Sequence, residues 1–237
     1  MGTKVALVTG AAGALGAEVA RALAATGHKL ALVDSAQAAA RLAEVARDIG
    51  GGAVAAFDIT SATSWNEKLV VLERELGAPV SHAALIAGGW RGGKKLFEET
   101  DDATYDAMMS ANATTVYRSL RALLPGMVAR GSGSVVLVGS RAVERPWSSA
   151  GAAAYGASKN AAVALAQAAA EEVLDRGVRI NAVLPSTMDT PANRRAMPDV
   201  DPAKWVSLAS AAGVIAFLLS DAARDVSGAA VPVYGRA

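Results

Sequence analysis

Residues 4–16 read Lys4-Val5-Ala6-Leu7-Val8-Thr9-Gly10-Ala11-Ala12-Gly13-Ala14-Leu15-Gly16, and they give the first indication of the fold class. Its apolar start predicts a buried strand, and the Ala-rich pattern over 14–26 predicts a helix. Between them, Gly10, Gly13 and Gly16 permit a tight turn and a close approach of backbone N–H groups to a pyrophosphate. A glycine-rich turn from strand to helix is typical of a dinucleotide site. The spacing is G-x-x-G-x-x-G, so a tight turn without a ligand is the alternative.

The same alternation of apolar runs and helical patterns continues along the chain. Strands are expected at residues 4–9, 29–34, 53–57, 83–87, 134–139, 179–184 and 229–234. Helices are expected at 14–26, 36–48, 62–76, 102–130, 152–176 and 204–220. Most strand runs are continuously apolar, as in strands that are covered on both faces. This order predicts an α/β fold with a doubly wound parallel sheet, built as a single domain.

Composition excludes several classes of function. Apolar residues make up 52% of the 237 residues, and the net charge is +1 with no basic stripe. Nucleic acid and anionic membranes are therefore not expected as partners. The chain has no cysteine and only two histidines, His28 and His82, so we expect no disulfide, no thiol catalysis and no metal site. The apolar run at the start is too short for a signal peptide or a membrane span, which favours a cytoplasmic protein.

The pair Tyr155 and Lys159 carries the strongest indication of chemistry. Residues four apart on a helix share one face, and a nearby ammonium lowers the pKa of a tyrosine. The pair is thus a candidate acid/base device. Ser140 ends a predicted strand and can donate a hydrogen bond to a substrate oxygen, although a local turn is the alternative. Asn112 lies in the helical pattern 102–130, either in a buried functional position or exposed on the helix.

Two aspartates follow predicted strands. Asp34 lies 18 residues after Gly16, where a carboxylate can accept hydrogen bonds from ribose hydroxyls and would repel a 2′-phosphate. This favours NAD(H), with NADP(H) as the alternative; Asp34 can also cap the following helix. Asp58 either holds the adenine edge or caps the helix that begins near Ser61.

Three loop features are candidates for substrate contacts. The segment 185–202 holds four prolines and follows a strand end, where open α/β sheets place their ligands, so we expect a substrate lid. An ordinary surface excursion is the alternative. Trp90 and Arg194 also lie in predicted loops; they line a substrate pocket or are solvated.

In this order, the motifs resemble those of the classical short-chain dehydrogenase/reductase family over essentially the whole chain. The family's T-G-x-x-x-G-x-G turn appears as Thr9 to Gly16, and its N-N-A-G motif appears as Leu85-Ile86-Ala87-Gly88. Asn112, Ser140, Tyr155 and Lys159 match its catalytic tetrad. Its P-G-x-x-x-T motif matches Pro185 to Thr190, with Ser186 in place of glycine, and Val226-Ser227-Gly228-Ala229 resembles its closing V-T-G.

Two loops are similar to those of quinonoid dihydropteridine reductases. Ala87-Gly88-Gly89-Trp90-Arg91-Gly92-Gly93 resembles their A-G-G-W-x-G-G, and residues 184–198 resemble their L-P-x-T-x-D-T-P-x-N-R-x-x-M-P. Those enzymes use NADH to reduce quinonoid dihydrobiopterin, but they typically lack the catalytic serine and asparagine that this chain has.

The resemblance implies a Rossmann-type domain over residues 1–237, with about seven strands and helices on both faces. It implies hydride transfer between NAD(P)(H) and a small organic substrate, either an alcohol/carbonyl or a quinonoid dihydropterin. Tyr155 would act as general acid, Lys159 would hold the nicotinamide ribose, and Asn112 would support a proton-relay water. The implied cofactor-binding residues are Gly10, Ala12, Gly13, Leu15, Gly16, Asp34, Asp58, Ile59, Ala87, Gly88, Tyr155, Lys159, Pro185, Thr187 and Thr190. The implied substrate-binding residues are Trp90, Ser140 and Arg194.

Other hypotheses concern the class of protein and its assembly. A non-catalytic dinucleotide-binding regulator on the same fold is the alternative to an enzyme, because fold does not fix function. The resemblance also implies a homodimer or homotetramer. The Ala-rich helices 102–130 and 152–176 could pack on symmetry mates, or only on their own sheet.

Overall fold

The computed structural model describes residues 3–99 and 101–236. Its centre is a parallel seven-stranded sheet in the order β3-β2-β1-β4-β5-β6-β7. The strands are β1 (Val5–Thr9), β2 (Lys29–Asp34), β3 (Ala53–Ala56), β4 (His82–Leu85), β5 (Gly133–Val138), β6 (Val178–Pro185) and β7 (Ala230–Val233). The predicted fold class is confirmed, and the strand order reverses between β1 and β4, where such sheets bind ligands.

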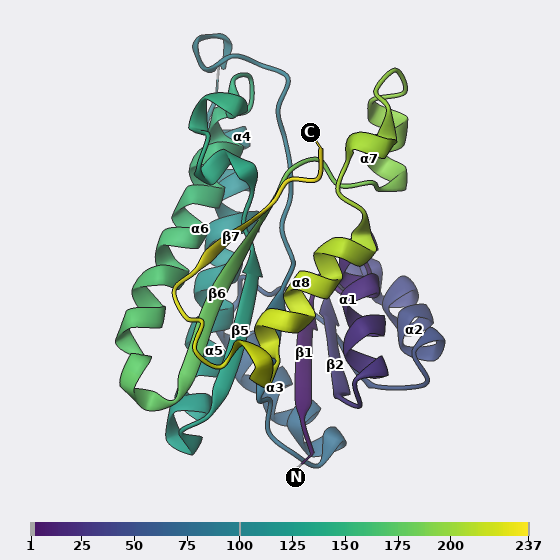
Figure 1. Cartoon of the computed structure of the whole chain (residues 1–237), viewed down its shortest axis with the longest axis vertical. Helices are drawn as coiled ribbons and strands as arrows, with labels where there is room; N and C mark the ends of the chain where they lie inside the picture. Colours follow the sequence, from purple (N-terminus) through teal and green to yellow (C-terminus); the bar gives the residue numbers. More distant parts are fainter. Residues whose placement is uncertain (1–2, 100, 237) are drawn as a thin grey trace.

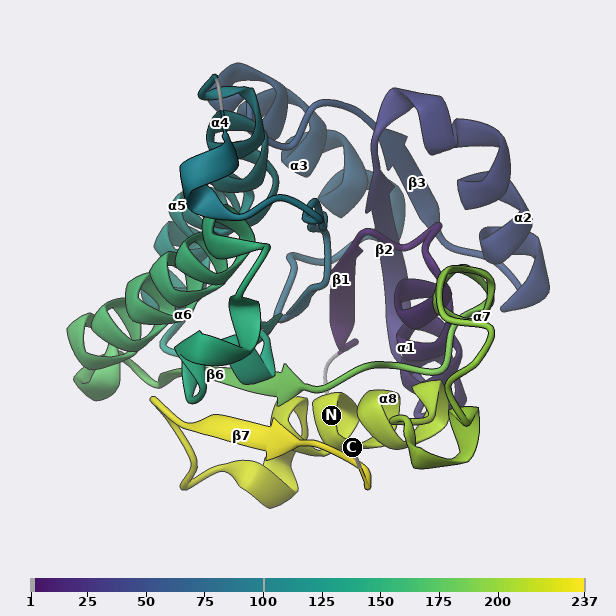
Figure 2. The ribbon, with the colours of Figure 1, turned by 90° about the horizontal axis from the view of Figure 1, so that it is seen from above.

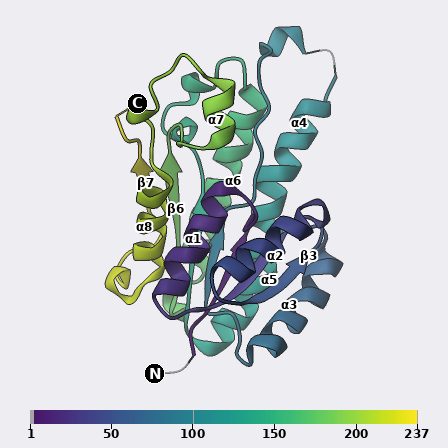
Figure 3. The same cartoon turned by 90° about the vertical axis from the view of Figure 1, so that its right-hand side faces the viewer.

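Long helices cover both faces of the sheet (Figures 1 and 3). One face carries α1 (Ala14–Ala25), α2 (Ala39–Asp48) and α8 (Leu208–Leu219). The other carries α3 (Ala62–Leu76), α5 (Thr115–Arg130) and α6 (Ala153–Glu172). None of the described helices is long and apolar enough to cross a membrane.

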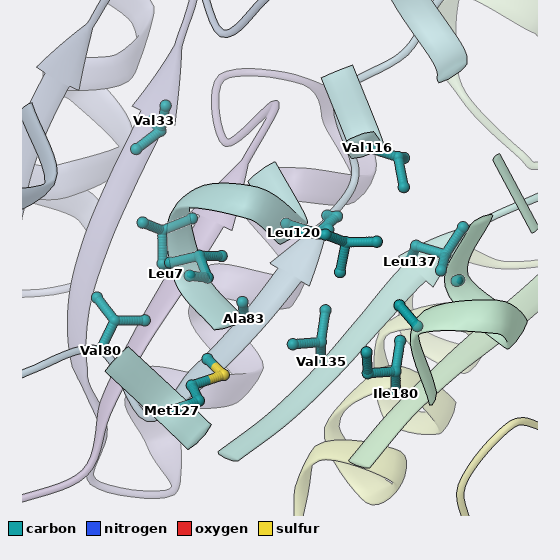
Figure 4. Packing of buried hydrophobic residues seen from close by; sticks show 14 of the residues in the cluster. Leu7, Val33, Val80, Ala83, Val116, Leu120, Met127, Val135, Leu137 and Ile180 are labelled. Carbon is teal, nitrogen blue, oxygen red and sulfur yellow. The ribbon is translucent and has the colours of Figure 1, made fainter. Parts of the chain in front are cut away.

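The two apolar clusters explain why the strands are apolar at every position. In β1, Val5 and Leu7 belong to the cluster under α3, α5 and α6, whereas Ala6 and Val8 belong to the one under α1, α2 and α8. Figure 4 shows the first cluster, where Leu7 and Met127 lie among residues of β4, β5 and α5. Successive side chains of a strand point to opposite faces, so burial on both faces requires a continuous apolar run.

The predicted strand 83–87 begins and ends earlier in the structure. β4 stops at Leu85 because the N–H groups of Ile86 and Ala87 donate to the Thr9 hydroxyl, at 3.0 and 3.2 Å, instead of to a neighbouring strand. The predicted helix 204–220 begins only at Leu208. Val206 forms a bridge with Met188, and the Ser207 hydroxyl caps α8 by accepting from the Ser210 N–H.

The predicted helix 102–130 is not one regular helix. It consists of α4 (Ala103–Met108), a π-helical turn (Met109–Thr114) and α5. π-Turns inside helices are rare and are often found at functional sites. Two further predicted helices, 36–48 and 152–176, are also regular over only part of their length. Residues 36–38 form a 3₁₀ turn before α2, and residues 174–176 form one after α6.

Two irregular segments rise above the carboxyl ends of the strands. The loop before α4 and the segment around α7 (Pro191–Ala196) both project beyond that edge (Figure 1), and the view from above places them on opposite sides of the β4 to β6 ends (Figure 2). Within the segment 185–202 the chain forms one short α-helix, α7. The Thr190 hydroxyl caps it by accepting a hydrogen bond from the Asn193 N–H at 3.1 Å.

Candidate active site

The glycine turn is closely packed against the end of β4. Gly10 adopts φ +67°, and a Cβ there would lie 2.8 Å from the backbone nitrogen of Ala87. A Cβ on Gly16 would overlap the carbonyl oxygen of Gly10. Gly13 is the N-cap of α1 and offers no side-chain cap. The first N–H groups of α1 therefore lack a capping acceptor among the described residues, and a helix end of this kind attracts a phosphate.

Asp34 supports this turn from the end of β2. One carboxylate oxygen accepts from the N–H of Ala12 at 2.9 Å, and the other accepts from the N–H of Ser35 at 2.8 Å. Ser35, not Asp34, is the N-cap of the 3₁₀ turn that follows. The capping alternative is thus wrong, and the half-buried carboxylate stands beside the glycine turn. Leu15 is buried in the core beneath the turn.

Asp58 does not cap α3. Its carboxylate accepts from both the N–H and the hydroxyl of Thr60, which lowers the pKa of Asp58, while Ser61 caps α3. The neighbouring Ile59 packs on the core and accepts from the Trp65 indole at 2.9 Å. The predicted adenine contacts of Asp58 and Ile59 stay predictions.

Asn112 lies in the π-turn and is 1% exposed, so the exposed alternative is wrong. Its amide nitrogen donates to the carbonyl oxygen of Gly89 at 3.1 Å and to the hydroxyl of Ser158 at 2.9 Å. Its amide oxygen accepts from the Gly89 N–H at 3.0 Å. This one side chain ties the β4 end to α6. Sequence reasoning missed Gly89 and Ser158, although both lie inside motifs already singled out.

Lys159 is buried on α6, and no carboxylate of residues 3–99 or 101–236 pairs with it. Its Nζ donates to the carbonyl oxygen of Val138, at the end of β5, at 2.9 Å. A Cβ on Gly88 would lie 3.1 Å from this Nζ and 2.6 Å from Oδ1 of Asn112, so glycine at 88 leaves the room in which the two side chains approach each other. Burial lowers the pKa of Lys159 to about 8, because a buried ammonium loses its hydration.

Tyr155 is one turn earlier on α6, and its phenol lies against Ser140. Burial raises the pKa of Tyr155, and a hydrogen bond with the Ser140 side chain acts in the opposite direction. The predicted lowering by Lys159 is therefore wrong for this structure, since Lys159 bonds to Val138 instead. Ser140 also accepts from the Ala142 N–H at 3.2 Å, so its local turn and its contact with Tyr155 coexist.

The segment 185–202 leaves the carboxyl end of β6 and lies across the strand ends from α4 (Figure 2). Pro185 ends β6, and the carbonyl of Thr187 accepts from the Val206 N–H at 2.9 Å. Thr190 caps α7, and Arg194 forms two hydrogen bonds with Asp189, at 2.6 and 2.7 Å. The guanidinium of Arg194 thus bonds within the segment 185–202. The predicted contact of Arg194 with the substrate stays a prediction.

The segment 88–93 lies on the opposite side of the strand ends. The Gly93 N–H donates to the carbonyl of Gly151 at 2.8 Å, just before α6. Trp90 is 66% exposed, and its ring edge lies beside Gly92. The ring is therefore accessible above the Tyr155 end of α6. Among the described residues no group of acidic or histidine side chains could hold a metal ion.

The chain has clear relatives. Residues 4–201 match the family model described as "short chain dehydrogenase". The chain is 36% identical to galactitol 2-dehydrogenase (L-tagatose-forming) of Cereibacter sphaeroides, over 97% of this chain and 93% of that protein. It is 32% identical to 2,5-dichloro-2,5-cyclohexadiene-1,4-diol dehydrogenase LinX of Sphingobium indicum, over 98% and 95%.

A solved structure agrees with these relatives. The structure of NAD⁺-bound xylitol dehydrogenase superposes with a TM-score of 0.87 at 26% identity, covering 98% of both chains. The glycine turn, the grouping of Asn112, Ser140, Tyr155 and Lys159, and these similarities lead to one assignment. The chain belongs to the short chain dehydrogenase family and is an oxidoreductase of the alcohol/carbonyl type.

Proposed function

We propose that the protein interconverts a secondary alcohol and a ketone on a small organic molecule, with NAD(H) as the preferred cofactor. One observation carries the proposal: Asn112, Ser140, Tyr155 and Lys159 converge at the carboxyl ends of β4 and β5, next to the glycine turn. A binding protein without catalysis does not need a buried lysine one helical turn from a half-buried tyrosine.

The turn fits a dinucleotide because α1 presents its first N–H groups without a side-chain cap. Glycine at 10 and 16 allows the turn to pack closely on Ala87 and on itself, which holds these N–H groups in place. Gly10, Ala12, Gly13 and Gly16 would hold the pyrophosphate. Lys159 and Thr190 would hold the nicotinamide half.

The preference for NAD(H) rests on Asp34. Its carboxylate stands at the end of β2 with a hydrogen bond to Ala12 N–H, so it can accept from ribose hydroxyls and repels a phosphate on the ribose. NADP(H) is the alternative.

When bound, the nicotinamide supplies or accepts the hydride. The phenol of Tyr155 and the hydroxyl of Ser140 donate hydrogen bonds to the carbonyl oxygen of a ketone. As negative charge develops on that oxygen, Tyr155 transfers its proton to it as general acid. In the oxidative direction Tyr155 removes the proton from the alcohol. Lys159, with a pKa of about 8, can return a proton to Tyr155 near neutral pH.

The alcohol/ketone class is supported by the intact tetrad and by relatives named for the oxidation of polyols and cyclic diols. A quinonoid dihydropterin is the second candidate, because the exposed ring of Trp90 offers a flat surface beside the site.

The test is an initial-rate panel that measures NAD⁺ reduction with polyols, cyclic diols and cyclohexanol, and NADH oxidation with ketones and a chemically generated quinonoid dihydropterin. We expect enzyme-dependent turnover in the alcohol/ketone arm. Turnover in the dihydropterin arm alone would contradict the alcohol/ketone class and favour a quinonoid dihydropterin as the substrate. NADH binding without turnover in any arm would favour the non-catalytic regulator.

Assembly and location are further proposals. We infer a homodimer or homotetramer in which the outer faces of α5 and α6 pack on a second copy; sedimentation equilibrium with a monomeric result would contradict it. The cytoplasmic location, and the lack of nucleic-acid and membrane partners, stay predictions.

A further inference from the structure

The last residue of β7 and the three residues after it, Val233–Arg236, form the C-terminal segment. This segment runs over the carboxyl edge of the sheet. Figures 1 and 2 place the end of the segment near the loop that leads from β6 to α7. None of these residues belongs to a motif that the sequence analysis singled out for chemistry. Their hydrogen bonds nevertheless join segments on two sides of the candidate active site.

On one side, Tyr234 holds the turn that follows Ser140. Its phenol donates to the Glu144 carboxylate at 2.6 Å, and the guanidinium of Arg145 lies 5.4 Å from the centre of its ring. Burial and the Glu144 carboxylate raise the pKa of Tyr234 to about 12, so the phenol remains a donor throughout the working pH range. Glu144 lies four residues after Ser140, on the same short turn.

On the other side, the C-terminal segment holds the start of segment 185–202, the predicted lid, and Lys204 just after that segment. The hydroxyl of Ser186 donates to the carbonyl of Tyr234 at 2.7 Å, and the N–H of Ser186 donates to the carbonyl of Val233 at 3.1 Å. The N–H of Arg236 donates to the carbonyl of Lys204 at 3.0 Å. Ser186 stands where the family motif has glycine, so the bond from its hydroxyl is a feature of this chain.

We propose that Tyr234 is a positioning residue that ties the Ser140 turn to the lid, and thereby sets the width of the substrate cleft. The proposal rests on the function proposed above. Ser140 and the lid belong to different strand ends, β5 and β6, and the C-terminal segment is bonded to both. Hydrogen bonds to a reacting oxygen tolerate little displacement, so a shift of either wall lowers substrate orientation and turnover.

The test compares the wild type with Tyr234→Phe, which keeps the ring over Arg145 but removes the bond to Glu144. Amide hydrogen exchange is measured without substrate at the N–H groups of Asp189 in the lid and of Val206, which bonds to the lid at Thr187. We expect exchange there to be about fivefold faster, the factor that corresponds to a net hydrogen bond of ~1 kcal/mol, with α1 unchanged. With the best alcohol of the panel, we expect kcat/KM to fall roughly 5- to 10-fold, mainly through KM, and the affinity for NADH to change less than about twofold.

Two controls make the outcome specific. Lys4→Met also removes one exposed bond to a carboxylate, the bond that the Lys4 ammonium donates to Asp221 at 2.7 Å, but Lys4 lies just before β1, at the amino edge of the sheet. It should leave lid exchange and kinetics unchanged. Glu144→Ala should reproduce Tyr234→Phe, and the double variant should be no worse than either single one, because both remove the same bond.

Unchanged lid exchange in Tyr234→Phe overturns the proposal, and so does faster exchange with a wild-type kcat/KM. Additive effects of Tyr234→Phe and Glu144→Ala also overturn it. If the wild type shows no turnover in the panel, the proposed function fails, whereas the exchange experiment still decides whether Tyr234 ties the turn to the lid.

Discussion

Replacing the buried lysine should stabilise this protein while it abolishes activity. Lys159 has lost its hydration, and its only hydrogen bond in the structure goes to the carbonyl of Val138. Its pKa falls from 10.5 to about 8. At 1.36 kcal/mol per pKa unit, keeping this ammonium charged inside the fold costs about 3 kcal/mol. Lys159→Met fills the space with an unbranched apolar chain and removes this cost.

The expected gain at pH 7 is smaller than the full cost. The variant leaves the carbonyl of Val138 without the lysine donor, a loss of about 1 kcal/mol. Lys159→Met should therefore be more stable than the wild type by roughly 2 kcal/mol, or about 4–8 °C in Tm for a chain of this size.

The pH dependence of the free energy of unfolding is an independent check that the buried ammonium is destabilising. The folded chain releases the Lys159 proton near pH 8, whereas the unfolded chain keeps it up to about pH 10.5. In that window the unfolded state binds more protons, so the stability of the wild type rises with pH. Lys159→Met should lack this rise, and Lys68→Met, on the exposed side of α3, should keep it.

The assay is urea unfolding of cofactor-free protein between pH 7 and about 9, a full unit below the pKa of about 10 of tyrosines in the unfolded chain. A Lys159→Met variant that is no more stable than the wild type at pH 7, together with an unchanged slope above pH 8, would refute the reasoning.

Four further predictions concern other parts of the molecule. Gly10→Ala should lose roughly 2–4 kcal/mol in urea unfolding, because φ is +67° and the new Cβ meets the backbone of Ala87 at 2.8 Å; calorimetry should also show weaker NADH binding. Arg179→Met should cost about 2 kcal/mol in the same assay, because Arg179 donates to four carbonyl oxygens at the end of α8 and just beyond it; an unchanged midpoint would contradict this. Burial, with a smaller effect of the neighbouring His28, lowers the pKa of His82 to about 4, so stability should fall as the pH drops from about 6.5 to 4, and acid titration of His82→Gln should show a shallower fall. Asp34→Ala should narrow the preference for NADH over NADPH by about tenfold in parallel kcat/KM measurements, and an equal preference before and after the change would remove Asp34 from ribose recognition.

The sheet and the glycine turn could be predicted because their causes are local. Burial on both faces makes each strand apolar throughout, as in β1, where Leu7 and Val8 face different clusters. The conformation of Gly10 is open to glycine and strained for other residues.

The features that the sequence did not predict depend on partners distant along the chain. The π-turn contains Asn112, whose bonds go to Gly89 and Ser158. The direction of the Tyr155 pKa depends on burial under other segments, not on the lysine one turn away. The tie from Tyr234 to Glu144 spans 90 residues, and no local pattern indicates it.

The measurement that tests the central claim most directly is the turnover of Tyr155→Phe beside the wild type, with the best substrate of the panel and with NADH affinity measured on the same samples. Tyr155 is the only group that the mechanism assigns to transfer a proton to or from the reacting oxygen. The account predicts that turnover falls by at least ~100-fold while NADH still binds. Near-normal turnover in Tyr155→Phe would contradict the account.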